Sequence, residues 1–191
     1  MTEISIAYCS SHAPMMAAAR DSAEENQRNR FFGALEIIRD DARRAGVQAC
    51  VVLSNEHFTN FFLENFPQIC VGVGERNWGP TEAWLPISKA WIPGHPGLAG
   101  HITRSLLNTG FDPAFSHQLE LDHGVMTVYH ELDPQLQLPL VPITRSSYAT
   151  PSRWPPSRPR TCRRRRPARS CGTTRPGCSA WSERRRRRGA R

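Results

Sequence analysis

The sequence predicts an α/β protein in which a mainly parallel sheet is flanked by helices. Two apolar runs on either side of an amphipathic stretch indicate a β-α-β unit, and further short apolar runs extend the sheet. Aliphatic residues then stop abruptly after Ile143, and arginine and proline become frequent. The 191 residues therefore divide into one domain over residues 1–143 and an appended tail over residues 144–191.

The first two predicted strands are Ile4–Cys9 and Val47–Leu53, which are short apolar runs. Between them, apolar residues recur at helical spacing and polar residues fill the other face. This helix should end at Gly46, because glycine readily adopts the left-handed conformation that closes a helix. A helical crossover makes the two strands parallel and should be right-handed. The apolar helix positions are Phe31, Leu35, Ile38, Ala42 and Ala45.

The remaining elements follow in order along the chain. Ile69–Val73 is a third apolar run and predicts a strand, while Leu98–Gly110 has the spacing of a second amphipathic helix. Trp78–Pro96 is rich in Pro, Gly and Trp, which predicts a long loop that covers a site and lies outside the core. Val125–Tyr129 and Leu138–Ile143 predict two more strands.

The tail, Thr144–Arg191, has a composition unlike that of the domain. It contains no Leu, Ile, Val, Met or Phe, so it has almost no apolar surface to bury against the entropy of ordering a chain. We expect it to be disordered. Its residues are those favoured by codons rich in G and C, which indicates a frame-shifted reading of a GC-rich gene. The sheet would then be incomplete at its carboxyl-terminal end.

The charge of the chain is concentrated in this tail. The whole chain carries +8, and the tail holds 16 of the 25 basic residues and one acid, so the tail is +15 and the domain is −7. A basic tail is compatible with nucleic-acid binding, but it lacks the aromatic or glycine interleaving of RNA-binding segments, which makes that partner the weaker alternative. No run approaches the roughly 20 apolar residues that cross a bilayer, and no signal peptide is visible, so we expect a cytoplasmic protein.

Two histidines, His12 and His57, each follow the carboxyl end of a predicted parallel strand. Ligands bind at this edge of open α/β sheets, so the two imidazoles should converge although they are far apart in the sequence. Convergent imidazoles indicate a metal site. For either histidine alone, a loop residue hydrogen-bonded to the backbone is the simpler interpretation.

A third histidine, His123, lies just before the predicted strand Val125–Tyr129. Imidazole titrates near neutral pH, so His123 is a candidate for proton transfer at the same site. A structural turn residue is an equally good interpretation of this position alone. The other four histidines have weaker claims, and they are His95, His101, His117 and His130.

Four motifs, in this order and at this spacing, resemble those of the class III extradiol ring-cleavage dioxygenases, the group of the protocatechuate 4,5-dioxygenase β subunit. Each motif is weak alone, but four in register over most of the domain are specific. The family usually has Asp at the position of Glu56. The motifs are Ser10–Pro14, Ser54–Pro67, Cys70–Gly74 and Leu121–Gly124.

The resemblance implies a non-heme iron(II) enzyme that inserts O₂ into a catecholic ring and gives a ring-opened semialdehyde. Iron in that family is held by two histidines and one glutamate, with open positions for oxygen chemistry. His12 and His57 match the two histidine ligands. His123 matches an active-site histidine that assists oxygen binding and proton transfer.

The resemblance also implies that two functional groups belong to the carboxyl-terminal half of the family domain. These groups are the glutamate ligand and a second acid–base histidine. The tail offers only Glu183 and no histidine, so neither role is assigned to a residue of this chain, and we expect the chain to be inactive by itself. A catalytically dead fragment and a nucleic-acid-binding protein are the alternatives, and the resemblance leaves open a homo-oligomer or a partner subunit.

Overall fold

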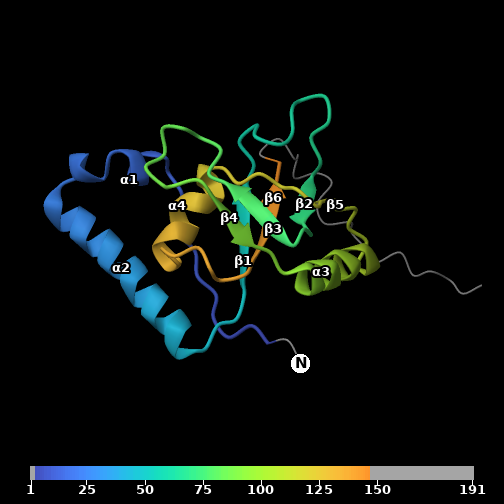
Figure 1. The fold of residues 1–191 in the computed structure, drawn as a ribbon, viewed down its shortest axis with the longest axis horizontal. Helices are drawn as coiled ribbons and strands as arrows, with labels where there is room; N and C mark the ends of the chain where they lie inside the picture. The colour runs from blue at the N-terminus through green and yellow to red at the C-terminus, as the bar shows by residue number, and fades with distance from the viewer. Residues whose placement is uncertain (1–2, 147–191) are drawn as a thin grey trace, which may run out of the picture. The chain divides into compact units, whose positions relative to one another are not determined.

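The protein is described by a computed structural model that covers residues 3–146 (Figure 1). Most of the expected disordered tail, residues 147–191, lies outside the described residues. Its first residues, Thr144 and Arg145, belong to the last strand. The helices and strands are α1 (Met15–Ala18), a one-turn 3₁₀ helix (Arg20–Ser22), α2 (Glu25–Arg44), β1 (Cys50–Asn55), β2 (Ile69–Gly72), β3 (Arg76–Gly79), β4 (Ala90–Pro93), α3 (Pro96–Asn108), β5 (Ala114–Ser116), α4 (His123–Leu132) and β6 (Leu140–Arg145).

The main sheet has four strands in the order β1-β6-β2-β5. β1 pairs with β6 in parallel, from Cys50 opposite Leu140 to Asn55 opposite Arg145, and β2 pairs with β5 in parallel. Only the contact between β6 and β2 is antiparallel. The predicted α/β class with a mainly parallel sheet is therefore confirmed, and β6, which comes last among the described strands, lies inside the sheet (Figure 1).

Helices cover the two faces of this sheet. Side chains alternate along β6, so Leu140 packs into a core cluster with α4, while Val141 and Ile143 pack into another with α3. α2 lies against α4, and Figure 1 shows α2 and α4 on one side of the sheet and α3 on the other. The predicted helix after the first strand is confirmed as α2, and Gly46 follows it with a φ of +63°.

β1 is an edge strand whose second face is open. Val51 and Leu53 lie opposite Val141 and Ile143 in the register, so they point to the same face. α3 packs mainly against β2 and β6 and leaves this part of the face uncovered. Leu53 is accordingly 76% exposed although it is an aliphatic residue in a strand.

The first predicted strand, Ile4–Cys9, is wrong. Residues 3–13 form no helix or strand, and Ile4 is 86% exposed. An apolar run becomes a strand only where a neighbour takes its hydrogen bonds, and in the described residues the parallel neighbour of β1 is β6. The predicted β-α-β pairing of the first two runs is wrong for the same reason.

The predicted strand Val125–Tyr129 is also wrong, because this segment lies in helix α4. The Asp122 side chain accepts a hydrogen bond from the Gly124 N–H and caps the helix. Val125, Met126 and Tyr129 are all buried, at the spacing of one helix face. The N-cap outweighs the strand preference of Val and Tyr.

The predicted loop Trp78–Pro96 is partly wrong. Its ends belong to β3 and β4, which pair as an antiparallel ribbon. Leu85 and Ile87 between these strands are buried in the same core cluster as α4. Within the described residues, no helix is both long and apolar enough to cross a membrane.

Candidate active site

Three histidine rings from distant parts of the chain lie together. His12 precedes α1, His57 follows β1, and His123 is the first residue of α4. The ring centroids of His57 and His123 are 4.2 Å apart, and His12 lies 5.3 Å from His57 and 6.2 Å from His123. The structure thus brings together all three histidines singled out from the sequence.

The Glu56 carboxylate shapes the loop that carries His57. Glu56 is 2% exposed, and its oxygens accept hydrogen bonds from the backbone N–H groups of Phe58 and Thr59, both at 2.7 Å. Its own N–H donates to the carbonyl oxygen of Arg145 in β6 at 3.1 Å. Because this carboxylate is occupied by the backbone of its own loop, Glu56 acts in the structure as a loop-forming residue.

Asp122 orients His57. Its Oδ2 accepts a hydrogen bond from the His57 backbone N–H at 3.1 Å and lies 2.9 Å from Nδ1 of the ring. Its Oδ1 accepts from the Gly124 N–H at 2.9 Å. A carboxylate on one ring nitrogen leaves the other nitrogen, Nε2, with the lone pair that a metal requires. The sequence pattern alone did not indicate this role, because His57 and Asp122 are 65 positions apart.

Glu82 holds His123 in the same manner. Its Oε1 accepts from the His123 backbone N–H at 2.9 Å and lies 2.7 Å from Nδ1 of the ring. Burial raises the pKa of the Glu82 carboxyl, but the hydrogen bonds from His123 outweigh burial and hold this pKa below its usual range. The Trp84 ring lies 5.7 Å from the His123 ring. The sequence indicated Glu82 only indirectly, through the prediction that the loop Trp78–Pro96, which contains this residue, covers a site.

Gly124 makes room for the cluster. A Cβ at this position would lie 2.8 Å from Cε1 of His57, 2.7 Å from Oγ of Ser54 and 2.9 Å from Oδ1 of Asp122. These distances are shorter than van der Waals contact. Glycine at the second position of α4 is therefore required for His57 and Asp122 to occupy their places.

His12 lies in an environment that favours its neutral form. Burial lowers the pKa of His12, and the neighbouring rings of His57 and His123 lower it further, while Asp122 opposes them. Neutral imidazole is the form that binds a metal ion. The electrostatics of the cluster therefore suit His12 as a ligand.

The described residues fit part of a metal site. His12 and His57 provide two imidazoles, which is the histidine part of a two-histidine, one-carboxylate site. Within residues 3–146, no group of three or more His, Cys, Asp or Glu side chains is arranged to hold a metal ion. The nearby carboxylates of Asp122 and Glu82 are occupied by imidazole nitrogens.

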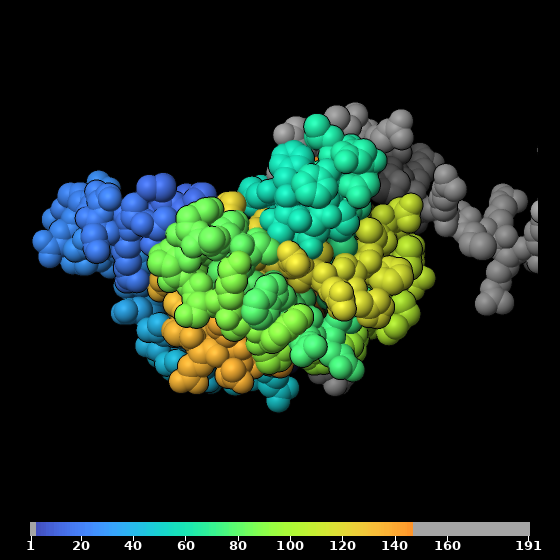
Figure 2. Space-filling view, turned by 45° about the horizontal axis from the view of Figure 1, so that its top comes forward, coloured from blue at the N-terminus to red at the C-terminus, as the bar shows by residue number. Residues whose placement is uncertain are grey.

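The segment between β1 and β2 stands out from the surface beside the site (Figure 2). Phe66 packs edge-on against Phe58, with ring centroids 5.7 Å apart, whereas Phe62 is 50% exposed. The aromatic residues that follow His57 therefore form a small cluster of their own. They supply apolar surface next to the histidine loop.

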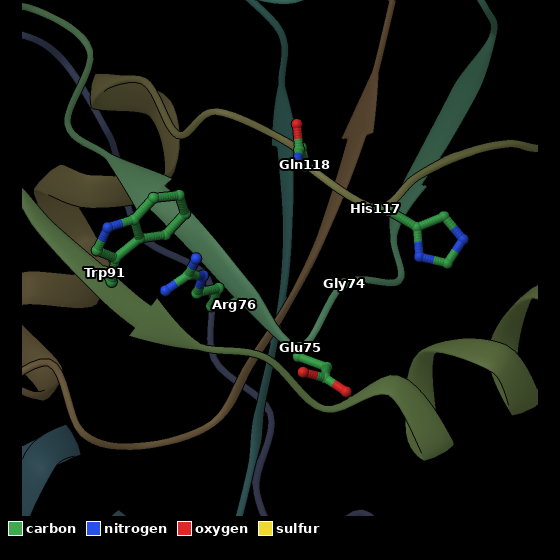
Figure 3. A pocket seen from close by; sticks show the side chains of 6 residues that line it. All are labelled: Gly74, Glu75, Arg76, Trp91, His117 and Gln118. Atoms are coloured by element: carbon green, nitrogen blue, oxygen red, sulfur yellow. The ribbon is translucent and has the colours of Figure 1, made fainter.

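A separate hollow of about 310 Å³ lies beside the β3–β4 ribbon (Figure 3). Figure 3 shows the Arg76 side chain next to Trp91. The guanidinium lies over the Trp91 ring, 4.1 Å from the ring centroid. None of the three clustered histidines lines this hollow. Its lining residues are Gly74, Glu75, Arg76, Trp91, His117 and Gln118.

Comparison with known protein families identifies the family of this chain. A family model described as the catalytic LigB subunit of aromatic ring-opening dioxygenase matches residues 6–153. The chain belongs to this family, and the resemblance to extradiol dioxygenases is confirmed. The match extends ten residues beyond Ile143, into the segment of changed composition.

Curated relatives carry the name 2,3-dihydroxyphenylpropionate/2,3-dihydroxicinnamic acid 1,2-dioxygenase. The one from Mycolicibacterium smegmatis is 29% identical over 147 residues, which cover 75% of this chain and 44% of the relative. The one from Photorhabdus laumondii is 29% identical over 146 residues, with the same shares. The Escherichia coli K12 protein is 25% identical over 148 residues, also with the same shares. The chain thus spans less than half the length of these relatives.

Proposed function

We propose that this chain carries the histidine part of the active site of an iron(II)-dependent extradiol dioxygenase. His12 and His57 would hold the iron, and His123 would transfer protons. The convergence of the three rings, with a carboxylate on Nδ1 of His57 and another on Nδ1 of His123, is the observation that supports this proposal. Membership of a ring-opening dioxygenase family supports it independently.

The proposed substrates are O₂ and a catechol, with 2,3-dihydroxyphenylpropionate as the first to test because the relatives carry its name. Bound iron(II) would supply the chemistry that brings O₂ and the catechol together. The chain's own residues have simpler tasks. Asp122 orients His57, and His123 accepts a proton from a substrate hydroxyl at its free ring nitrogen.

We further propose that the carboxylate ligand comes neither from residues 3–146 nor from the tail, whose single acidic residue is Glu183. The chain by itself should therefore bind iron weakly and turn over slowly or not at all. This proposal is supported by the contacts of the nearby carboxylates. Glu56 accepts hydrogen bonds from backbone N–H groups, and Asp122 and Glu82 are each in contact with a histidine ring nitrogen. A longer version with the remaining family sequence should bind one iron per chain and cleave the catechol.

The test is an anaerobic Fe(II) titration of this longer version, combined with an assay for the ring-opened product. His12→Ala and His57→Ala should each abolish tight binding, because a single imidazole cannot replace the pair. His101→Ala is the matched control, since His101 is an exposed residue of α3, and α3 lies on the opposite side of the sheet from α4 (Figure 1). Full iron binding by both site variants would refute the metal assignment.

A further inference from the structure

The contact between Glu82 and His123 determines which ring nitrogen carries the proton. Glu82 Oε1 is 2.7 Å from Nδ1 of His123, and its pKa lies below its usual range, so the carboxylate is an anion that only accepts. Nδ1 must therefore carry the hydrogen in the neutral ring. The same oxygen also accepts the His123 backbone N–H at 2.9 Å, which fixes the carboxylate relative to the start of α4.

The loop that carries Glu82 is fastened to the segment that leads into His123. The Thr81 N–H donates to the Leu121 carbonyl oxygen at 2.9 Å, and the Leu121 N–H donates to the Trp78 carbonyl oxygen at 2.8 Å. A Cβ on Gly79 would lie 2.7 Å from Cβ of Leu121, so the two segments touch backbone to backbone. This close pairing makes the position of Glu82 a property of the fold.

Both partners are shielded from water. The side chain of His123 is 11% exposed and that of Glu82 is 17% exposed, and Trp84 from the same loop lies against the His123 ring. A hydrogen bond from a ring N–H to a shielded carboxylate is stronger than one in water. The hydrogen bond to Glu82 can therefore determine which ring nitrogen of His123 carries the hydrogen. In a neutral histidine, the state of one ring nitrogen is set by the hydrogen bond that the other ring nitrogen makes.

We propose that Glu82 is the positioning residue for His123, holding it in the Nδ1–H tautomer so that Nε2 accepts the proton of the substrate. The catalytic meaning of this inference rests on the proposed role of His123. The tautomer itself does not, because it depends only on contacts within the chain. Asp122 and His57 show the same bonding, which gives the inference an internal parallel.

The experiment is two-bond ¹H–¹⁵N correlation NMR of the full chain with ¹⁵N-labelled histidine, without metal or substrate. The spectra are recorded at mildly alkaline pH. The His123 signals are assigned by their loss in His123→Gln. The wild type should show the Nδ1–H pattern for this ring.

Three variants decide the origin of that pattern. Glu82→Met keeps the chain length but removes the acceptor, so the Nε2–H form should become the major one. Glu82→Gln keeps an acceptor oxygen and should retain Nδ1–H as the major form. Glu75→Ala, which removes an exposed carboxylate outside the cluster, should leave the His123 signals unchanged.

The proposal is overturned if His123 is an Nε2–H tautomer in the wild type, or if Glu82→Met leaves the Nδ1–H pattern intact. Should Glu82→Met fail to fold, the wild type and Glu82→Gln decide: Nδ1–H in both supports the proposal and Nε2–H in either overturns it. Absence of iron binding and turnover in the longer version would refute the proposed function and leave these spectra unaffected, so the two failures are distinguishable.

Discussion

The carboxylate of Asp122 lies 2.9 Å from Nδ1 of His57, although 65 residues separate them in the sequence. The same side chain caps helix α4 through the Gly124 N–H. One residue thus links the start of a helix to the orientation of a proposed metal ligand. The two roles are separable by mutation.

Replacing Asp122 by Ala should affect both roles, and replacing it by Ser should affect only one. Asp122→Ala removes the cap, at a cost of about 1 kcal/mol of stability. It also frees the His57 ring, which should weaken iron binding by about 10- to 100-fold. Asp122→Ser restores a capping oxygen but is too short to reach the ring. Thermal unfolding should therefore recover in Asp122→Ser while the Fe(II) titration does not, and joint recovery would contradict the orienting role.

Gly124→Ala should damage the site even though alanine favours helices. The new Cβ would lie 2.8 Å from the His57 ring, so the ring or the helix must move. We expect a loss of about 1–3 kcal/mol in the free energy of unfolding, as for other overpacked positions, together with weaker metal binding.

Gly33→Ala in α2 is the matched control, because a Cβ there meets nothing within 4 Å. It should stabilise the protein by about 0.5–1 kcal/mol. Equal effects of the two substitutions in urea unfolding would show that the space around Gly124 is not limiting.

His123→Ala should separate catalysis from metal binding. In a version of the protein that turns over catechol, this change should lower turnover on the order of 10²-fold, as for the loss of a general base. Iron content should not change, because His12 and His57 remain. Iron analysis and product formation on the same sample provide the measurement, and loss of iron would make His123 a ligand.

The pH dependence of stability should reflect His12. Its pKa in the folded protein lies below the ordinary value of 6.5, so the unfolded chain takes up a proton first as the pH falls. His12 therefore costs no stability well above pH 6.5, and the free energy of unfolding should decrease as the pH falls from 6.5 towards the folded pKa. Denaturant unfolding at several pH values checks this, and His12→Gln should flatten that part of the profile.

The hypothesis of a shifted reading frame predicts a result at the level of the gene. Translating the coding DNA in the other two forward frames should restore aliphatic periodicity after the domain. It should also reveal a downstream glutamate and a glycine-rich Ser-His segment. Absence of these features in both frames would refute the hypothesis.

The convergence of His12 and His57 was predictable, but the route to it was partly wrong. His57 follows a strand, as its apolar run indicated, whereas the residues before His12 form none. An apolar run indicates that a segment tends to be buried. It does not indicate which neighbouring strand, if any, supplies the hydrogen bonds that a strand needs. The start of α4 was marked by the N-cap Asp122, a signal that the strand-forming Val and Tyr residues concealed.

The contact between Glu82 and His123 could not have been predicted from the sequence. The two residues are 41 positions apart, and Glu82 lies in a loop without periodicity. Their meeting depends on the pairing of the Trp78 and Thr81 backbones with Leu121. Contacts of this kind follow from the assembled fold and leave no local pattern.

The central place of β6 has a consequence for the order in which the molecule assembles. β1 cannot join β2 and β5 until Leu140–Arg145 has been synthesised and inserted between them. Such pairing between distant segments is slow compared with local helix formation. The loop of His57, which is anchored to Arg145 through Glu56, therefore acquires its final position late in folding. Ribosome-bound chains that stop before β6 should have formed α2 but not the histidine cluster.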